Sequence, residues 1–278
     1  MNAQAAAKTS AATDASSLIL LREDVGNIAI LTLNRPQTLN TLSEDMLDAL
    51  RDALTAIAHD TRVRVVILAA NGPAFSAGHD LKELHRRRSD EDKGLGYFKH
   101  IFATCGAMMQ QIVTLPQPII ATVQGTATAA GCQLVASCDL AVASRSAKFA
   151  TSGINFGLFC STPMVALSRN VARKQAMEML LTGEMISAER AEAIGLVNRV
   201  VAPGHEREEA LTLAKKIAAQ SAFALKLGKE AFYRQLPMSL AEAYEYTSAV
   251  MVENLLARDA EEGMNAFIDK RPPKWEDR

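Results

Sequence analysis

Hydrophobic and polar positions along the chain predict an α/β fold for its first two-thirds. Short apolar runs that stop at turn residues predict buried strands, and longer stretches with apolar residues at helical spacing predict helices. The predicted strands cover residues 18–22, 28–33, 63–69, 119–123, 140–143 and 197–201. The predicted helices between them cover residues 43–58, 98–115, 162–170, 173–181 and 187–195.

The segment from residue 28 to residue 69 predicts a parallel crossover unit, in which a strand, a helix and a second strand follow one another. Thr41 and Glu44 have the spacing of a capping box, which predicts where the helix begins. The second strand is too apolar to face water, so we expect it inside a sheet. Residues 82–99, in contrast, are crowded with charge and contain two glycines, which predicts a mobile surface segment.

The last part of the chain is predicted to be helical, over residues 206–219, 222–235, 239–257 and 259–269. Its apolar positions exceed what one small helical layer can bury, so we expect the chain to self-associate. These positions include Leu240, Tyr244, Val250, Leu255, Leu256 and Phe267. We therefore expect a disordered tail at residues 1–17, an α/β core at 18–200 and a helical oligomerisation region at 201–278.

Composition narrows the class of protein and its location. With 278 residues and 49% hydrophobic content, the chain can bury a large core. A net charge of -1 gives no reason to expect nucleic acid or an anionic membrane as a partner. Four cysteines without metal-type spacing predict reduced thiols and no metal site. Residues 1–17 have no apolar block and no Arg, which argues against a targeting segment and, with the thiols, predicts a cytoplasmic protein.

A central stretch at residues 118–139 carries the strongest indication of chemistry. A buried strand ends at Gly125, a segment of Gly, Ala and Thr follows to Gly131, and apolar residues then continue at helical spacing. Such a segment exposes the backbone N–H groups at a helix N-terminus, which can bind an anion or a carbonyl oxygen that is becoming one. Close packing of the helix on the strand requires the same small residues, so both interpretations stand at this point.

Three motifs together resemble those of the crotonase, or enoyl-CoA hydratase/isomerase, superfamily. Ala74-Phe-Ser-Ala-Gly-His-Asp-Leu81 resembles the family's first motif, and the central stretch resembles its second. Leu181-Thr-Gly-Glu-Met-Ile-Ser-Ala188 with Gly195-Leu-Val197 resembles the third. The resemblance runs from about residue 20 to 270. It implies a crotonase-like spiral of ββα units with a C-terminal helical trimerisation region, acyl-CoA thioester substrates, and trimers that often pair into hexamers.

The resemblance also implies an oxyanion hole, formed by two backbone N–H groups that hold the thioester oxygen as it gains enolate character. By position the donors are His79 and Ala130. A backbone donor tolerates any side chain, so neither residue type excludes the hole. The His79 imidazole could also act as an acid or base, but a loop His more often bonds locally or is solvated.

The family's hydratases use two carboxyl side chains, and this sequence has neither. Matching the motifs places Gln133 at the first Glu position and Gly153 at the second. Gln has no proton to give at any useful pH, and Gly has no side chain. Because each general acid or base contributes roughly 10²–10⁴ in rate, hydration should be largely lost even if the hole is intact.

Cys160 falls where some family members carry a nucleophilic or basic Asp. A thiolate there could attack the thioester or abstract a proton if a cation or a helix N-terminus lowered its pKa. The alternative is a buried Cys that acts as a small apolar residue, which is the commoner case.

The family's coenzyme pocket is partly the backbone of the loop that holds Ala77, Gly78, His79, Asp80 and Leu81. The phosphates need cations, and Arg35, Lys82 and Lys229 are candidates by position, although a solvated side chain is commoner for each. The glycines of the central stretch do not form a dinucleotide-binding or P-loop motif.

We therefore expect a nominal enoyl-CoA hydratase family member that binds acyl-CoA and stabilises a thioester enolate, with no permanently bound cofactor. The alternatives are a non-catalytic acyl-CoA-binding or regulatory protein, and an acyl-CoA hydrolase or isomerase that uses Cys160. The expected partners are acyl-CoA and other copies of the chain, as a homo-trimer or hexamer, without nucleic acid or membrane.

Overall fold

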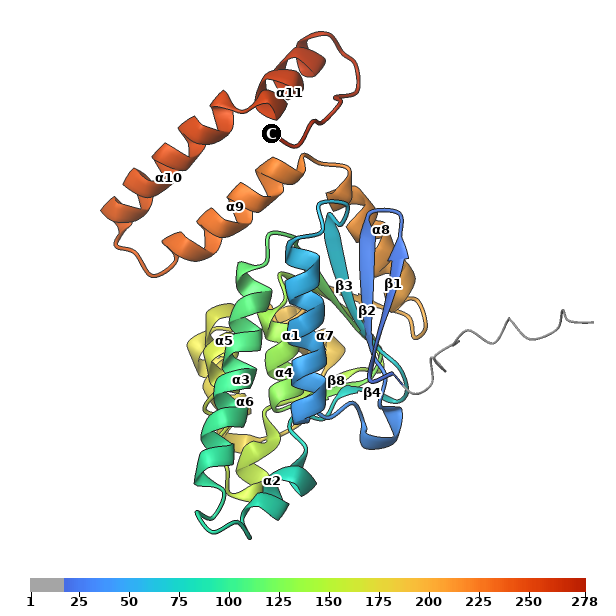
Figure 1. Ribbon diagram of the computed structural model, residues 1–278, viewed down its shortest axis with the longest axis vertical. Coiled ribbons are helices and arrows are strands. Elements are labelled where there is room, and N and C mark those ends of the chain that lie inside the picture. Colours follow the sequence, from blue (N-terminus) through green and yellow to red (C-terminus); the bar gives the residue numbers. More distant parts are fainter. Residues whose placement is uncertain (1–17) are drawn as a thin grey trace, which may run out of the picture.

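The computed structural model describes residues 18–278, so the predicted disordered tail at 1–17 lies outside the described residues. The described chain forms a layered α/β body with an extension of helices beside it (Figure 1). The prediction of an α/β fold followed by C-terminal helices is confirmed.

A six-stranded sheet forms the centre of the body. Its strands, in spatial order, are β1 (Leu20–Val25), β2 (Ile28–Leu33), β3 (Val65–Ala70), β5 (Ile119–Val123), β7 (Leu140–Ser144) and β10 (Arg199–Val201). The first two strands form an antiparallel hairpin, and every later pairing is parallel. β2 and β3 thus confirm the predicted parallel crossover, and β3 lies inside the sheet as its apolar run predicts.

A second, smaller sheet was not predicted from the sequence. It contains β4 (Ala74–Ser76), β6 (Thr126–Thr128), β8 (Lys148–Ala150) and β9 (Ile186–Ser187), in that spatial order. Strands of two or three residues are too short to show a period of two, and their partners lie far away in the sequence. This sheet matters for function because β4 leads into the first motif loop and β6 leads into the central helix.

Helices cover both faces of the six-stranded sheet. On one face lie α1 (Glu44–Ala58), α3 (Leu95–Thr114) and α4 (Ala130–Ser137), which bury a large apolar cluster with alternate residues of the strands. On the other face lies α8 (Glu206–Ala218), whose Ala210, Ala214 and Ala218 pack against Ile30 and Ile67. Small residues on α8 let this helix approach the strands closely. Because both faces are buried, the strands are continuous apolar runs.

The remaining helices are α2 (Leu81–Arg87), α5 (Pro163–Asn170), α6 (Arg173–Thr182), α7 (Ala188–Ala193), α9 (Ala222–Gln235), α10 (Leu240–Leu256) and α11 (Arg258–Ile268). Two short 3₁₀ helices, η1 (Pro36–Thr38) and η2 (Ser152–Phe156), complete the elements of residues 18–278. Figure 1 shows α9, α10 and α11 as a separate layer that extends from the body. Since α8 packs on the sheet, the helices that stand apart begin with α9.

Two local predictions were wrong. Helix α1 is capped by Ser43, whose Oγ accepts from the N–H of Met46 at 3.3 Å, rather than by Thr41. Residues 82–99 are largely helical, in α2 and the start of α3, rather than a mobile segment. Asp80 explains the first of these helices, because its carboxylate accepts from the N–H groups of Lys82 and Glu83 and so caps α2.

Candidate functional site

The structure brings the first motif loop and the central stretch into direct contact. A Cβ added at Gly78 would lie 3.0 Å from the carbonyl oxygen of Thr128 and 3.1 Å from the amide nitrogen of Ala130. A Cβ added at Gly131 would lie only 2.2 Å from the carbonyl oxygen of Ser76. Glycine at both positions therefore allows the backbones to approach, which places the residue after Gly78 beside the N-terminus of α4.

Ala129, directly before α4, has an unusual backbone conformation. Its φ of 50° and ψ of -118° lie where an L-residue with a Cβ is strained. Hydrogen bonds hold it there: its N–H donates to the Ala150 carbonyl at 2.9 Å, and its carbonyl accepts from the Gln133 N–H at 3.0 Å. This bend fixes the direction in which the next amide, that of Ala130, points.

The two predicted donors, the N–H groups of His79 and Ala130, have no hydrogen-bond acceptor among residues 18–278. Ala130 is the first residue of α4, so its N–H is one of those that a helix leaves unsatisfied. An oxyanion hole requires two free amides that reach one oxygen, and these two amides lie on adjoining backbones. No ligand tests this arrangement, so the hole stays a prediction.

The His79 side chain lies against the body of the protein. Its Nδ1–H donates to the Leu42 carbonyl at 3.2 Å, and its ring meets Phe102 edge to face at 5.1 Å between centroids. Nε2 is buried and has no hydrogen-bond partner within residues 18–278. Burial lowers the pKa of His79 from its ordinary value, and the bond to Leu42 opposes this only in part. The imidazole is therefore neutral near pH 7, and its surroundings indicate a packing role.

The two positions of the family's carboxylates have different surroundings. Gln133 is buried on the first turn of α4, and its Oε1 has no hydrogen-bond partner. Gly153 lies in η2, where an added Cβ would be 2.5 Å from the Leu158 carbonyl oxygen and 2.8 Å from the Cys160 Sγ. A larger residue therefore does not fit at 153 without movement of residues 158–160.

Cys160 has the surroundings of a buried thiol. Burial raises its pKa, and the Gly153 N–H, which donates to Sγ at 3.2 Å, counteracts this effect only partly. No cation is among the causes that act on this pKa. A thiol with a raised pKa holds little thiolate near pH 7, so the geometry favours the packing interpretation over the nucleophile.

Lys229 forms a buried ion pair with Asp139. Its Nζ donates to Asp139 Oδ2 at 2.7 Å and to the carbonyls of Ile112 and Gln117. Tyr233 donates to the other oxygen of Asp139, at 2.9 Å, and the Ile119 N–H also donates to the carboxylate. We call Asp139, Lys229 and Tyr233 the Asp139 cluster. It ties α9 to the end of α4, because Asp139 accepts from the backbone at Ile119 and from two side chains of α9.

Burial and the Asp139 carboxylate act in opposite directions on the pKa of Lys229. Burial lowers the pKa of Lys229, and the neighbouring Asp139 carboxylate opposes that shift. Tyr233 was not singled out in the sequence. Its position four residues after Lys229 places both on one face of α9, which is the signal that pairs them.

The other coenzyme candidates stay predictions. The Arg35 guanidinium donates to the carbonyls of Leu18 and Asn34. Lys82 is exposed in the first turn of α2, directly after the cap at Asp80. The Ala77 N–H donates to Leu39, and Leu81 is exposed beside Lys82.

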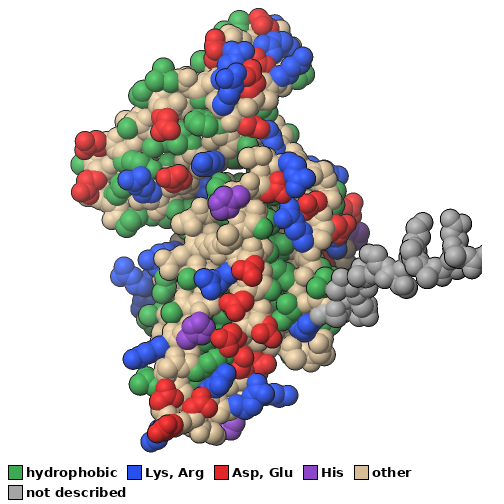
Figure 2. Space-filling model, in the orientation of Figure 1, with side chains coloured by type: hydrophobic (Ala, Val, Ile, Leu, Met, Phe, Trp, Pro, Cys, Tyr) green, Lys and Arg blue, Asp and Glu red, His purple; other side chains and the backbone are tan. Residues whose placement is uncertain are grey.

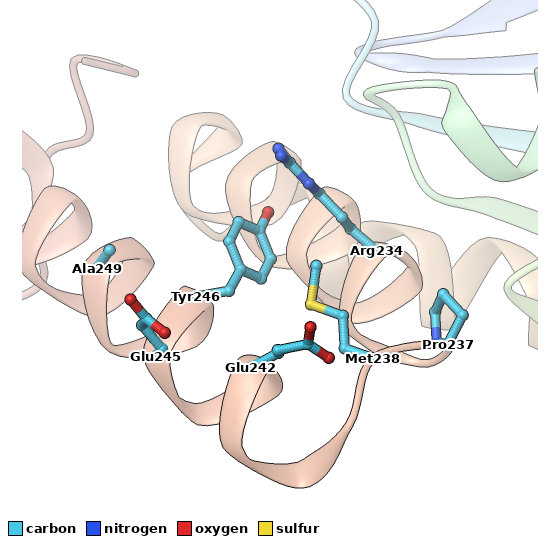
Figure 3. Close-up of a pocket in the computed structure, with 7 residues that line it drawn as sticks. All are labelled: Arg234, Pro237, Met238, Glu242, Glu245, Tyr246 and Ala249. Atoms are coloured by element: carbon cyan, nitrogen blue, oxygen red, sulfur yellow. The ribbon is translucent and has the colours of Figure 1, made fainter.

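Two cavities of the described chain lie away from the two motif loops. One, of about 610 Å³, lies between α9 and α10, and Figure 3 shows Arg234 and Tyr246 close together among the residues that line it. The Arg234 guanidinium carbon is 4.7 Å from the centroid of the Tyr246 ring. The other, of about 310 Å³, is lined by the Asp139 cluster and by Phe232. Neither includes a residue of the two motif loops.

Two further searches of the described chain gave negative results. From residue 18 onward, no group of three His, Cys, Asp or Glu residues is placed to hold a metal ion. Within the same residues, no helix is both long and apolar enough to cross a membrane.

The chain belongs to the enoyl-CoA hydratase/isomerase family, whose model matches residues 23–278. A solved enoyl-CoA hydratase of Mycobacterium smegmatis is 52% identical, with a TM-score of 0.89 over 93% of this chain and 99% of that one. The structure of human enoyl-CoA hydratase domain-containing protein 3 is 48% identical, with a TM-score of 0.88 over 93% of this chain and 100% of that one. These structures confirm the crotonase-type fold that the motifs predicted.

Among curated proteins, the mitochondrial enoyl-CoA hydratase domain-containing protein 3 of Homo sapiens is 49% identical over 245 residues, which are 88% of this chain and 79% of the relative. The prediction of a cytoplasmic protein is contradicted by such relatives, which are named mitochondrial in Xenopus laevis and Rattus norvegicus as well. The prediction relied on reduced thiols and on the absence of an apolar block and of Arg from residues 1–17. All four cysteines are free and buried, so their state reflects packing and does not identify a compartment.

Proposed function

We propose that this protein binds acyl-CoA thioesters and polarises the thioester carbonyl between the backbone N–H groups of His79 and Ala130. One observation carries the proposal: these two amides have no acceptor in the part of the chain that the structure describes. They lie on two backbones that approach closely because residues 78 and 131 are glycine. An oxygen held there accepts two hydrogen bonds, which stabilise the negative charge that an enolate-like state places on it.

The site binds and polarises better than it transfers protons. Gln133 and Gly153 stand where hydratases of this family carry carboxylates, and His79 is neutral with its Nδ1 already bonded to Leu42. Without a positioned acid or base, the polarised thioester is held but converted slowly at most. This favours a second candidate function, that of an acyl-CoA-binding protein without efficient turnover.

Calorimetric titration with butyryl-CoA, run beside a turnover screen over crotonyl-, malonyl- and hydroxyacyl-CoA thioesters, tests the proposal. We expect saturable binding of the thioester with weak or no turnover. Rapid turnover would show that the protein is an enzyme rather than a binding protein. If no thioester bound, both candidate functions would be overturned.

We also propose that the chain assembles into trimers, alone or paired as hexamers. The separate layer of α9, α10 and α11 carries large exposed apolar side chains, and Figure 2 shows hydrophobic side chains along it. Leu256 and Phe267 are 82% and 84% exposed in the single chain. A surface of this kind is characteristic of an interface.

Light scattering at micromolar concentration is expected to give the mass of three or six chains of 30.0 kDa each. Replacing both Leu256 and Phe267 by Ser should lower the measured molecular mass, because it removes apolar area from the proposed interface and so favours smaller assemblies. The matched variant Leu18→Ser, at an exposed apolar residue outside this layer, should leave the mass unchanged. A wild-type mass of one chain would refute the proposal.

A further inference from the structure

Asn40, which lies between η1 and α1, is fully buried although its side chain is polar. Its Oδ1 accepts a hydrogen bond from the Arg35 N–H at 2.8 Å. Its Nδ2 donates to the carbonyls of Asn71 and Ala74 at 2.8 and 2.9 Å, which uses both of its N–H groups. A buried amide group needs such partners, so the three bonds fix the place of Asn40 in the fold.

A short backbone segment, residues 39–42, is bonded in turn to the first motif loop. The Leu39 carbonyl accepts from the Ala77 N–H at 3.0 Å. The Leu42 N–H donates to the Gly78 carbonyl at 2.8 Å. This 39–42 segment therefore holds the loop backbone immediately before the first proposed donor of the oxyanion hole.

The 39–42 segment also contacts His79, whose N–H is that donor. Leu42 and His79 form a parallel β-bridge. The Leu42 carbonyl accepts from the His79 Nδ1–H at 3.2 Å, so it holds the side chain as well. Since His79 pairs with Leu42 through both its backbone and its ring, a shift of the 39–42 segment would turn the His79 N–H in a new direction.

Two left-handed residues in a row give the 39–42 segment its course. Leu39 has a φ of 55° and Asn40 a φ of 51°. This conformation is unfavourable for residues with a Cβ, although Asn tolerates it better than Leu does. The side-chain bonds of Asn40 offset that cost and join the segment to Ala74, where β4 begins. Asn40 thus links the segment that holds the end of the motif loop to the strand that leads into it.

We infer that Asn40 is a positioning residue, which sets the direction of the His79 N–H in the proposed oxyanion hole. The inference rests on the proposed function, because the direction of this N–H matters only if a thioester oxygen occupies the hole. Asn40 is itself buried and acts through the 39–42 segment. Hydrogen bonds weaken steeply when the donor points away from the acceptor, so a small displacement of the segment is enough to lose one.

The vibrational band of the thioester carbonyl in bound butyryl-CoA reports this direction. Infrared difference spectra at saturating ligand, with a heavy isotope at the carbonyl, are compared for the wild-type protein, Asn40→Asp and Asn40→Gly. Asn40→Asp keeps the acceptor for Arg35 and removes both donors, whereas Asn40→Gly removes the side chain and adopts a positive φ without strain. In both variants we expect the band to return toward its frequency in water by about half or more of the wild-type shift, because one of two donors is lost. A loss of stability alone does not move the band, since the spectrum reports folded protein with ligand bound.

Asn170→Asp is the matched control. The Nδ2 of Asn170 also donates to two carbonyls, those of Ala136 and Ala166, at 2.8 and 2.9 Å, and these bonds do not involve the 39–42 segment. The substitution is the same as at Asn40 and removes the same number of donors. This variant should keep the band of the wild-type complex.

A wild-type band in both Asn40 variants would overturn the inference and leave the proposed function standing. An equal displacement of the band in Asn170→Asp would overturn it as well. Failure of both Asn40 variants to fold would also overturn it, because Asn40 would then serve the fold as a whole. A wild-type protein that binds no thioester, or binds it without lowering the carbonyl band, would overturn the proposed function together with the inference.

Discussion

Hydration of crotonyl-CoA by the wild-type protein is expected to be at least about 10⁴-fold slower than the ~10 s⁻¹ median of enzymes. Two general acid–base groups are missing, and each contributes roughly 10²–10⁴. The buried Gln133 amide can orient a water molecule but cannot take its proton. Gly153 leaves no space for a side chain next to the Leu158 carbonyl and the Cys160 Sγ. The measurement is the loss of absorbance of the conjugated thioester.

Gln133→Glu should raise the hydration rate by up to about 10²-fold, since it restores one group. Gln133→Met is the control of equal length and should not raise it. Adding Gly153→Glu is expected to bring no further gain and to lower stability, because the new Cβ alone would lie 2.5 Å from a backbone oxygen. A wild-type rate near the median would contradict the account. Cys160→Ser and His79→Ala would then be the next variants, and an undiminished rate in both would refute this description of the site.

Lys229→Met is expected to lower the free energy of unfolding by about 3–5 kcal/mol, because it leaves the Asp139 carboxylate buried without its cation. The Lys229 and Asp139 side chains are only 7% and 15% exposed, so water screens the pair poorly. Chemical denaturation at one fixed protein concentration measures the change, since assembly makes stability depend on concentration.

Two controls separate this buried pair from an ordinary surface one. Asp139→Asn combined with Lys229→Met removes both charges and keeps an acceptor for the Ile119 N–H. The double variant should therefore lower the free energy of unfolding by less than Lys229→Met alone. Arg51→Met breaks an exposed ion pair with Asp48 on α1. It should lower the free energy of unfolding by under about 1 kcal/mol. A similar small effect of Lys229→Met would show that the Asp139 cluster does not stabilise the fold.

The sequence predicted the elements that carry their own periodicity. Strand β3 is a continuous apolar run, and α1 repeats apolar residues at helical spacing, so each was placed within about two residues. The second sheet was missed, because β4 pairs with β6 across some fifty residues and neither strand is long enough to show a pattern. Tertiary contacts, rather than local preference, decide such strands.

For the site, sequence reasoning found the loops but not their internal geometry. Glycine at 78 and 131 was part of the motifs, and the structure shows why nothing larger fits. The bend at Ala129 depends on backbone angles, which residue types alone do not determine. Lys229 was assigned to coenzyme phosphates by position, but its partner Asp139 lies 90 residues away and only the fold brings them together.

The central claim is that the amides of His79 and Ala130 polarise a thioester carbonyl. Infrared difference spectroscopy of butyryl-CoA, labelled with a heavy isotope at that carbonyl, measures this polarisation without any need for turnover. Two hydrogen bonds from preorganised backbone donors weaken the C=O bond, so the account predicts a band at lower frequency in the complex than in water. A bound thioester whose carbonyl band lies at or above its frequency in water would contradict it.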